Sequence, residues 1–169
     1  IRIVSKDKDL AQLLEDGRVE IYDVHTDACT DVAKLKEEKG ISPAQVIDML
    51  ALMGDTVDNV PGVPGIGPKT AAELISTYGS LDAVVAEAMK PDSAIKGKRL
   101  ENIRATADAL PLSKRLVTLR YDAPVDLRLE EARVAGLRLE RLIPILKELG
   151  FNRYQEEVKG LLGIGGQDD

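Results

Sequence analysis

Residues 54–70 read GDTVDNVPGVPGIGPKT, and the prediction of the fold starts from this stretch. Its second half combines glycine and proline at short intervals, which predicts a compact connection and not a helix or a strand. Pro68 suits the first position of a helix, and the following residues favour that helix to about Tyr78. The first half carries Asp55 and Asp58 and predicts a short acidic turn. An acidic turn therefore leads directly into a glycine-rich hairpin.

The hairpin has the features of a helix-hairpin-helix type segment that contacts a nucleic-acid backbone. Gly65 and Gly67 permit positive φ and leave no side chain in the path of a phosphate, while Ile66 can anchor the loop in the core. Free amides at the start of the next helix favour an anion, and Lys69 adds a full positive charge, although Pro68 removes one donor. The alternative is an ordinary turn between packed helices. The residues predicted to bind DNA are Gly62, Val63, Gly65, Ile66, Gly67, Lys69 and Thr70.

Two pairs of aspartates predict part of a metal site beside this hairpin. Asp7 and Asp9 follow a predicted strand, at the edge where open α/β sheets place ligands. Asp55 and Asp58 stand three residues apart, so one helical turn would present both on the same side. Carboxylates held close together repel one another unless they bind a cation, and Mg²⁺ and Mn²⁺ prefer carboxylate oxygens. For either pair alone, the alternative is a role as helix or turn caps.

Alternation and periodicity predict two strands and seven helices around the hairpin. Residues 2–4 and 19–24 favour strands, the second with one face covered. Asp7 suits the N-cap of a short amphipathic turn of helix. The longer helices are predicted at residues 30–39, 43–53, 68–78, 82–89, 93–108, 112–119 and 137–148. The predicted fold class is therefore α/β to mostly α, with the strands at the edge of a parallel or mixed sheet whose other members would lie upstream of Ile1.

The composition favours a globular chain without a membrane span. The 169 residues are 44% apolar, which is enough to bury one core, and the apolar runs are too short to cross a bilayer. Cys29 is the single cysteine, so the fold does not depend on a disulfide and a cytoplasmic location is expected. Aromatic residues make up 3% of the chain, which argues against base stacking as the main mode of binding.

The net charge of −6 is unevenly distributed along the chain. Residues 1–60 carry thirteen acidic against seven basic side chains, whereas residues 90–120 carry eight basic against three acidic ones. A solvated helix surface would explain the basic stretch by itself. With the hairpin taken into account, an acidic end that faces a basic stretch is compatible with a metal site next to a surface that binds DNA.

Several runs resemble the 5′→3′ exonuclease, or flap nuclease, domain of bacterial DNA polymerase I and its stand-alone relatives. The strongest are VSKDKDLAQL at residues 4–13 and ALMGDTVDNVPGVPGIGPKTA at residues 51–71, and weaker ones lie at 78–82, 119–125 and 149–151. Their order and spacing agree over nearly the whole chain. The resemblance implies a truncated PIN/FEN-like nuclease fold, in which a sheet edge precedes a helix-three-turn-helix element.

The resemblance also implies roles for particular residues. Asp7, Asp9, Asp55 and Asp58 would be metal-binding and catalytic carboxylates of a two-metal Mg²⁺ or Mn²⁺ site, and residues 62–70 would hold duplex DNA, with K⁺ bound to carbonyls of that loop. The remaining carboxylates and the basic arch of the family would precede Ile1, so the site is expected to be incomplete here. Lys6 replaces a residue that is usually small in the family and would put a cation beside the site.

The implied organisation has three parts. Residues 1–60 would form the carboxyl-terminal part of the α/β metal-site subdomain, residues 61–160 a helical DNA-binding subdomain, and residues 161–169 a linker-like tail. The sheet edge would be exposed and could pair with another chain to give a dimer. Whether polymerase domains follow Asp169 is left open by the sequence.

The implied function is hydrolysis of DNA phosphodiesters at 5′ ends or flap junctions, during replication and repair in the bacterial, nucleoid-containing cytoplasm. The isolated fragment is expected to bind metal weakly and to cleave poorly or not at all. A non-catalytic helix-hairpin-helix DNA-binding module is one alternative, in which the acids serve only as caps and for solubility. A helical protein-interaction domain is another, and it predicts no salt-dependent affinity for DNA.

Overall fold

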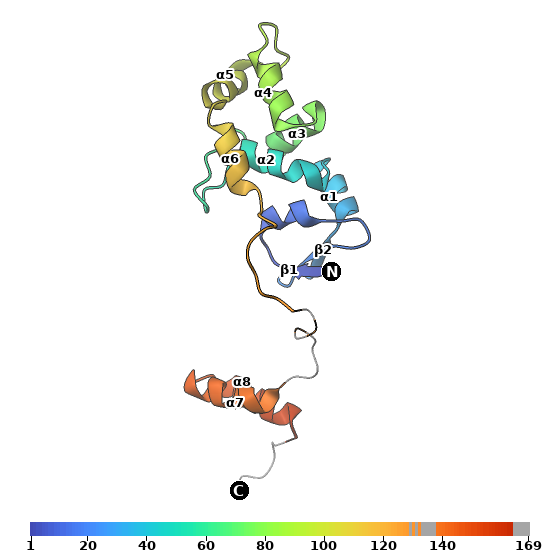
Figure 1. Cartoon of the computed structure of the whole chain (residues 1–169), viewed down its shortest axis with the longest axis vertical. Coiled ribbons are helices and arrows are strands. Elements are labelled where there is room, and N and C mark those ends of the chain that lie inside the picture. Colours follow the sequence, from blue (N-terminus) through green and yellow to red (C-terminus); the bar gives the residue numbers. More distant parts are fainter. Residues whose placement is uncertain (129, 131, 133–137, 164–169) are drawn as a thin grey trace. The chain divides into compact units, whose positions relative to one another are not determined.

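The computed structural model describes residues 1–128, 130, 132 and 138–163. The chain divides into two compact units, residues 1–122 and residues 123–169 (Figure 1). The predicted boundary between residues 60 and 61 lies inside the first unit. Of the predicted tail, Leu161 ends a helix and residues 164–169 lie outside the described residues.

A small mixed sheet forms one end of the first unit (Figure 1). β1 (Arg2–Val4) pairs in parallel with β2 (Glu20–Asp23), and β2 pairs in an antiparallel manner with β3 (Ala28–Thr30). The order β1-β2-β3 leaves one side of β1 unpaired within the described part of the chain. The predicted mixed sheet edge is thus present, with one strand more than expected.

The third strand corrects the expectation of a helix that begins at Thr30. Asp27 adopts φ 54°, a left-handed conformation that closes the turn between β2 and β3, and its carboxylate accepts a hydrogen bond from the Tyr22 hydroxyl at 2.8 Å. The helix begins two residues later, because Asp31 caps it by accepting the amide of Lys34 at 2.8 Å.

The remaining elements of the first unit are helical. The 3₁₀-helix η1 (Lys8–Leu13) follows β1, and the 3₁₀-helix η2 (Pro43–Gln45) precedes α2. The α-helices are α1 (Val32–Lys39), α2 (Val46–Met53), α3 (Pro68–Tyr78), α4 (Leu81–Met89), α5 (Gly97–Thr106) and α6 (Leu110–Val117). Each lies close to a range predicted from the sequence.

The core of the first unit is organised around α2. Its residues Met49 to Leu52 are almost completely shielded from solvent, and the helix packs against α3, α4, α6 and η1. Burial of a leucine side chain contributes about 1.5–3 kcal/mol to folding. Figure 1 shows α2 between the sheet at one end of the unit and α4 and α5 at the other. The helix α2 ends at Met53, with Gly54 as its C-cap, and the acidic turn follows directly. The packing of α2 in the core therefore determines where the acidic turn starts.

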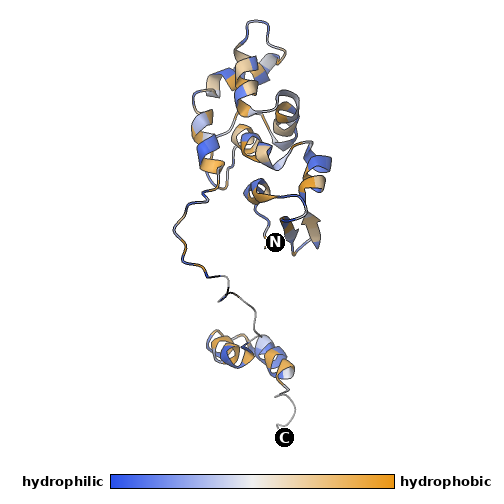
Figure 2. Ribbon diagram, turned by 45° about the vertical axis from the view of Figure 1, so that its right-hand side comes forward, coloured by the Kyte–Doolittle hydropathy of each residue, from blue (hydrophilic) through white to orange (hydrophobic). Residues whose placement is uncertain are grey.

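The second unit contains two helices that pack against each other, α7 (Leu139–Glu148) and α8 (Asn152–Leu161). Leu146 and Val158 are buried between them, and Phe151 contacts Tyr154 edge to face. The helix α8 is additional to the seven helices whose ranges were predicted, and it contains Glu156, whose glutamate-rich segment is typical of a solvated helix face. Figure 2 shows apolar and hydrophilic residues mixed on both helices. Among all residues that the structure describes, no helix is long and apolar enough to span a membrane.

Candidate functional site

The acidic turn and the hairpin are joined through their backbones. Gly54 adopts φ +70°, and a Cβ atom placed on it would lie 2.5 Å from the amide nitrogen of Gly62. A Cβ atom on Gly62 would lie 2.4 Å from the carbonyl carbon of Met53. Only glycine fits at both positions, and the amide of Val63 adds a hydrogen bond to the carbonyl of Leu52 at 2.8 Å. We call this contact the Gly54–Gly62 seam.

The hairpin is anchored in the core and open toward solvent. Val63 and Ile66 are buried, which confirms the predicted anchoring role of Ile66, while Lys69 is exposed. Gly65 has φ +78°, but Gly67 has φ −92° because it is the N-cap of α3. The positive φ that both glycines permit is therefore adopted at Gly65 only. A Cβ atom on Gly67 would meet nothing within 4 Å, so the space beside it is free.

Two helices from later in the chain hold the hairpin in place. The side-chain amide of Asn102 on α5 donates to the carbonyl of Pro64 at 2.7 Å. The hydroxyl of Ser113 on α6 donates a short hydrogen bond to the carbonyl of Pro61. These contacts fix both ends of the segment before α3, and neither was predicted from the sequence.

The first aspartate pair lies at the start of η1. Asp7 is the N-cap, and its carboxylate accepts the amide of Asp9 at 2.9 Å. The Oδ1 atom of Asp9 is buried and has no hydrogen-bond partner among the described residues. A buried carboxylate oxygen without a donor is costly, so a site that retains one is a candidate for binding a cation.

The second pair lies on the short acidic turn that the sequence predicted, and this turn is not helical. The amide of Asp55 donates to the carbonyl of Val60 at 2.9 Å, and the amide of Val60 donates back at 2.7 Å. The Asp55 carboxylate is buried and also caps the turn, because it accepts the amide of Val57 at 2.8 Å. Asp58 is exposed on the same turn.

A lysine links the two pairs. The Nζ atom of Lys8 lies 2.6 Å from Oδ2 of Asp55, and this hydrogen bond, followed by the amide of Val57, lowers the pKa of the Asp55 carboxyl. The family resemblance implied a cation at Lys6 instead. Lys6 contributes to the lowered pKa of Asp23, whereas Lys8, between Asp7 and Asp9, supplies the charge at the site. The Asp-Lys-Asp order could have indicated this role.

Asp9 lies within electrostatic range of the other three aspartates. The pKa of Asp9 is raised, first by burial, then by the charge of Asp7, with smaller contributions from Asp55 and Asp58, while Lys8 opposes the shift. They do not share one cavity. A cavity of 520 Å³ is lined by Lys8, Asp55 and the hairpin, whereas Asp7 borders a separate one of 220 Å³.

The donor chemistry fits a divalent cation, but the site is incomplete. Asp7, Asp9, Asp55 and Asp58 offer hard oxygen ligands, and Oδ1 of Asp9 is a free one. Within residues 1–128, 130, 132 and 138–163, however, no group of three or more His, Cys, Asp or Glu side chains is placed to hold a metal ion. The chain therefore supplies carboxylates near one another without forming a finished coordination shell.

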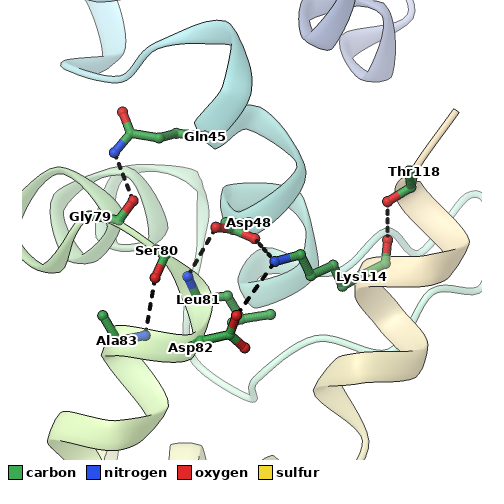
Figure 3. Close-up of polar contacts among 9 residues, drawn as sticks. All are labelled: Gln45, Asp48, Gly79, Ser80, Leu81, Asp82, Ala83, Lys114 and Thr118. Carbon is green, nitrogen blue, oxygen red and sulfur yellow. Dashed lines mark hydrogen bonds and ion pairs between the residues drawn. The ribbon is translucent and has the colours of Figure 1, made fainter.

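The helix α6 connects the elements that carry the site. Lys114 forms an ion pair with Asp48 on α2 (Figure 3). The adjacent Ser113 holds Pro61 through its hydroxyl group. At the end of α6, the side chain of Gln12 from η1 donates to the carbonyl of Val117 and accepts the amide of Leu119, both at 3.0 Å. The helix thereby braces η1, α2 and the hairpin against one another.

Comparison with known sequences identifies relatives among nucleic-acid enzymes. Residues 41–140 match the model of the family described as 5′-3′ exonuclease, C-terminal SAM fold. A DNA polymerase I of Rhizobium leguminosarum is 41% identical over 158 residues, covering 94% of this chain and 15% of that protein. A flap endonuclease Xni of Aeromonas salmonicida is 38% identical over 131 residues, covering 78% of this chain and 48% of that protein. The chain thus spans less than a fifth of that polymerase.

Solved structures of a bacteriophage enzyme share the fold. T5 5′-exonuclease with bound zinc ions superposes with a TM-score of 0.60 at 28% identity, over 69% of this chain and 42% of that one. A T5 flap endonuclease in a pseudo-enzyme-product complex with DNA and metal ions gives a TM-score of 0.60 at 27% identity over the same shares. The fold class predicted from the sequence is confirmed by these likenesses.

Proposed function

Since this chain belongs to the 5′-3′ exonuclease family, C-terminal SAM fold, as its sequence predicted, we propose that it is the carboxyl-terminal part of a metal-dependent 5′→3′ exonuclease or flap endonuclease of the DNA polymerase I type. The complete domain would hydrolyse DNA phosphodiesters at 5′ ends or flap junctions in replication and repair in the bacterial cytoplasm. The DNA polymerase I relatives, which extend well beyond the length of this chain, support a longer native protein that continues into polymerase domains.

The observation that carries the proposal is the shared cavity of Asp55 and the hairpin. The Gly54–Gly62 seam places a buried carboxylate on the wall of the same 520 Å³ cavity that the hairpin lines from Gly62 to Pro68. A protein that only binds DNA gains nothing from an acidic group there, because a carboxylate repels phosphate. An acid next to an anion-binding loop is expected where a cation bridges the two.

The residues proposed to hold divalent ions are Asp7, Asp9, Asp55 and Asp58. Mg²⁺ or Mn²⁺, when bound by a pair of such sites, supplies activation of water and stabilisation of the leaving oxygen. T5 5′-exonuclease has been solved with bound divalent zinc ions, and the T5 flap endonuclease with DNA and metal ions, which supports the proposal for this chain. Because a finished coordination shell is not formed by the described residues, we expect the isolated chain to bind these ions weakly and to cleave poorly.

The hairpin is proposed to hold the DNA backbone. The open space beside Gly67 admits a phosphate, the amides at the start of α3 point outward from the helix, and the exposed Lys69 adds charge. The other predicted contacts, Gly62, Val63, Gly65, Ile66 and Thr70, would act by shaping and anchoring the loop. Loop carbonyls would also bind K⁺, as the family resemblance implies.

The proposal is tested by fluorescence anisotropy with a labelled duplex that carries a 5′ flap, in EDTA so that cleavage does not interfere. Lys69→Ala should weaken binding and reduce the slope of log K against log salt by about 1. Gly67→Ala should fold normally, because its Cβ meets nothing, yet should bind DNA more weakly. Lys159→Ala on α8 of the second unit is the matched control. Equal affinities for all four proteins would contradict the proposal.

A second function, a non-catalytic DNA-binding module, is favoured by one observation. Asp55 already has structural partners in Lys8 and the amide of Val57. The exposed Asp58 discriminates between the two functions. In the complete domain, Asp58→Ala should reduce metal-dependent cleavage and leave DNA binding intact if the protein is a nuclease. If it is only a binding module, no metal-dependent cleavage should exist in the parent protein.

A further inference from the structure

We propose that the ammonium group of Lys8 is an internal counter-ion for the aspartate cluster, which a divalent cation displaces when it binds. This inference rests on the proposed function and concerns the same site. It assigns a role to a residue that lies between two proposed ligands and that no comparison identifies.

The position of Lys8 supports this role. Its Nζ atom lies 2.6 Å from Oδ2 of Asp55, so a side chain of η1 reaches the turn after α2 and connects the two aspartate pairs. Lys8 also borders both cavities, the one beside Asp7 and the one lined by the hairpin. A single positive charge therefore lies against the carboxylate of Asp55, one of the proposed metal ligands.

The two partners of the ion pair differ in how firmly they are held. The Asp55 side chain is 7% exposed and is fixed by the amide of Val57, whereas the Lys8 side chain is 40% exposed on a flexible stem. When the pair opens, Lys8 can move into water at low cost, because an ammonium is strongly hydrated. Asp55 stays in place as a ligand. The pair can thus exchange its cation without a change in the fold.

The charge balance explains why a counter-ion is needed. The ammonium of Lys8 pairs with the buried carboxylate of Asp55, and Asp7 and Asp9 flank Lys8 in the sequence. Without Lys8 and without a divalent ion, the Asp55 carboxylate would lose its counter-ion. A divalent ion supplies twice the charge of an ammonium and several coordination positions, so it should outcompete Lys8 at sufficient concentration.

The first test compares Lys8→Met with the parent chain of 169 residues. In EDTA, Lys8→Met should have a lower Tm, because the carboxylates lose their counter-ion. In a titration with Mn²⁺ followed by electron paramagnetic resonance, the same variant should bind roughly three- to tenfold more tightly, since the ion no longer displaces an ammonium. Lys6→Met is the matched control and should change neither value. Lys8→Arg should behave like the parent chain.

The second test needs no substitution and so does not depend on folding of a variant. The parent chain is treated with an amine-acetylating reagent, with or without Mg²⁺, and acetylation of each lysine is measured by mass spectrometry. Modification of Lys8 should increase severalfold when Mg²⁺ is added, whereas Lys98, which pairs with Glu101 on α5, should not change.

The outcomes separate this inference from the proposed function. If the parent chain binds Mn²⁺ and Lys8→Met binds it equally well or more weakly, the counter-ion role is wrong and the metal site remains. Unchanged acetylation of Lys8 at a Mg²⁺ concentration that saturates the chain would also overturn the role. If neither protein binds Mn²⁺ at any concentration, the metal site fails and the counter-ion role fails with it.

Discussion

The ammonium of Lys114 lies 2.7 Å from Oδ1 of the buried carboxylate of Asp48, and the other oxygen of that carboxylate accepts the amide of Leu81 at 3.1 Å (Figure 3). The ion pair connects α6 to α2. The hydrogen bond from the amide of Leu81 connects α2 to the first turn of α4. The hydrogen bond with Asp48 is also the main reason why the pKa of Lys114 is raised. The contribution of this ion pair to stability is therefore fully present below pH 10.5, the ordinary pKa of a lysine. It is lost as pH rises through the raised pKa of Lys114.

Replacement of Lys114 by Met should lower the free energy of unfolding by about 2–3 kcal/mol. Removal of one partner leaves Asp48 buried and charged, which typically costs about 3–5 kcal/mol, and the value is smaller here because Lys114 is partly exposed. Urea unfolding at pH 7 measures the change. Lys98→Met, which breaks an exposed pair with Glu101, is the control and should cost at most about 1 kcal/mol. Equal costs for the two variants would contradict the bracing role of α6.

The Gly54–Gly62 seam predicts a large loss of stability for one glycine substitution and little change for another. Gly62→Ala should destabilise the chain by about 3 kcal/mol or more, because its Cβ would overlap the backbone of Met53 and Gly54. Gly67→Ala should leave stability within about 1 kcal/mol of the parent, since its φ is negative and its Cβ meets nothing. Thermal unfolding followed by circular dichroism distinguishes the two. Equal stability of both variants would show that the backbones are not in contact.

Gln12 should contribute to stability through the two hydrogen bonds that join η1 to the end of α6. Gln12→Ala removes the partners of the Val117 carbonyl and the Leu119 amide and should cost about 1–2 kcal/mol. Hydrogen exchange measured by NMR gives a local reading, because the amide of Leu119 should lose its protection. Protection of the Val63 amide, which bonds to Leu52, should change much less. An unchanged Leu119 amide would contradict the contact.

The pKa shifts of Asp9 and Asp55 predict opposite pH dependences in EDTA. The pKa of Asp9 is raised above 3.8, so its contribution to stability is fully present below that pH and is lost as pH rises through the folded-state value. Asp9→Asn should therefore be more stable than the parent chain at pH 7, and the difference should shrink as pH approaches 4. Thermal unfolding at several pH values measures it.

Asp55 provides a control for which the expected change in stability has the opposite sign. Its pKa is lowered, so its contribution is present above pH 3.8 and is lost as pH falls through the folded-state value. Asp55→Asn should accordingly be less stable than the parent chain at pH 7. If both substitutions changed stability in the same direction, the electrostatic description of the cluster would be wrong.

Local signals in the sequence were sufficient for most of the fold. Gly40 and Gly54 end helices where they were expected to, and Pro68 begins α3, because chain conformation at these residues is determined by their own covalent structure. The strand β3 was missed because Asp27 closes its turn in a left-handed conformation that is uncommon for a residue with a side chain.

The candidate site was only partly predictable for a different reason. The aspartates are recognisable by residue type and spacing, and their role as metal ligands remains a prediction. The contacts that position them join residues far apart in the sequence, such as Gln12 with Leu119 or Asn102 with Pro64. No local pattern encodes such pairs. The ion pair between Lys8 and Asp55 likewise depends on how η1 packs against α2.

The Gly54–Gly62 seam has a consequence for how this site tolerates sequence change. Since the approach is between main-chain atoms, the spacing from Asp55 to the hairpin is insensitive to the identity of the side chains around it. Between them, Val57 is 89% exposed and can carry a spectroscopic label. A fluorophore at position 57 would report on the arrival of a phosphate or an ion at a location whose geometry it does not disturb.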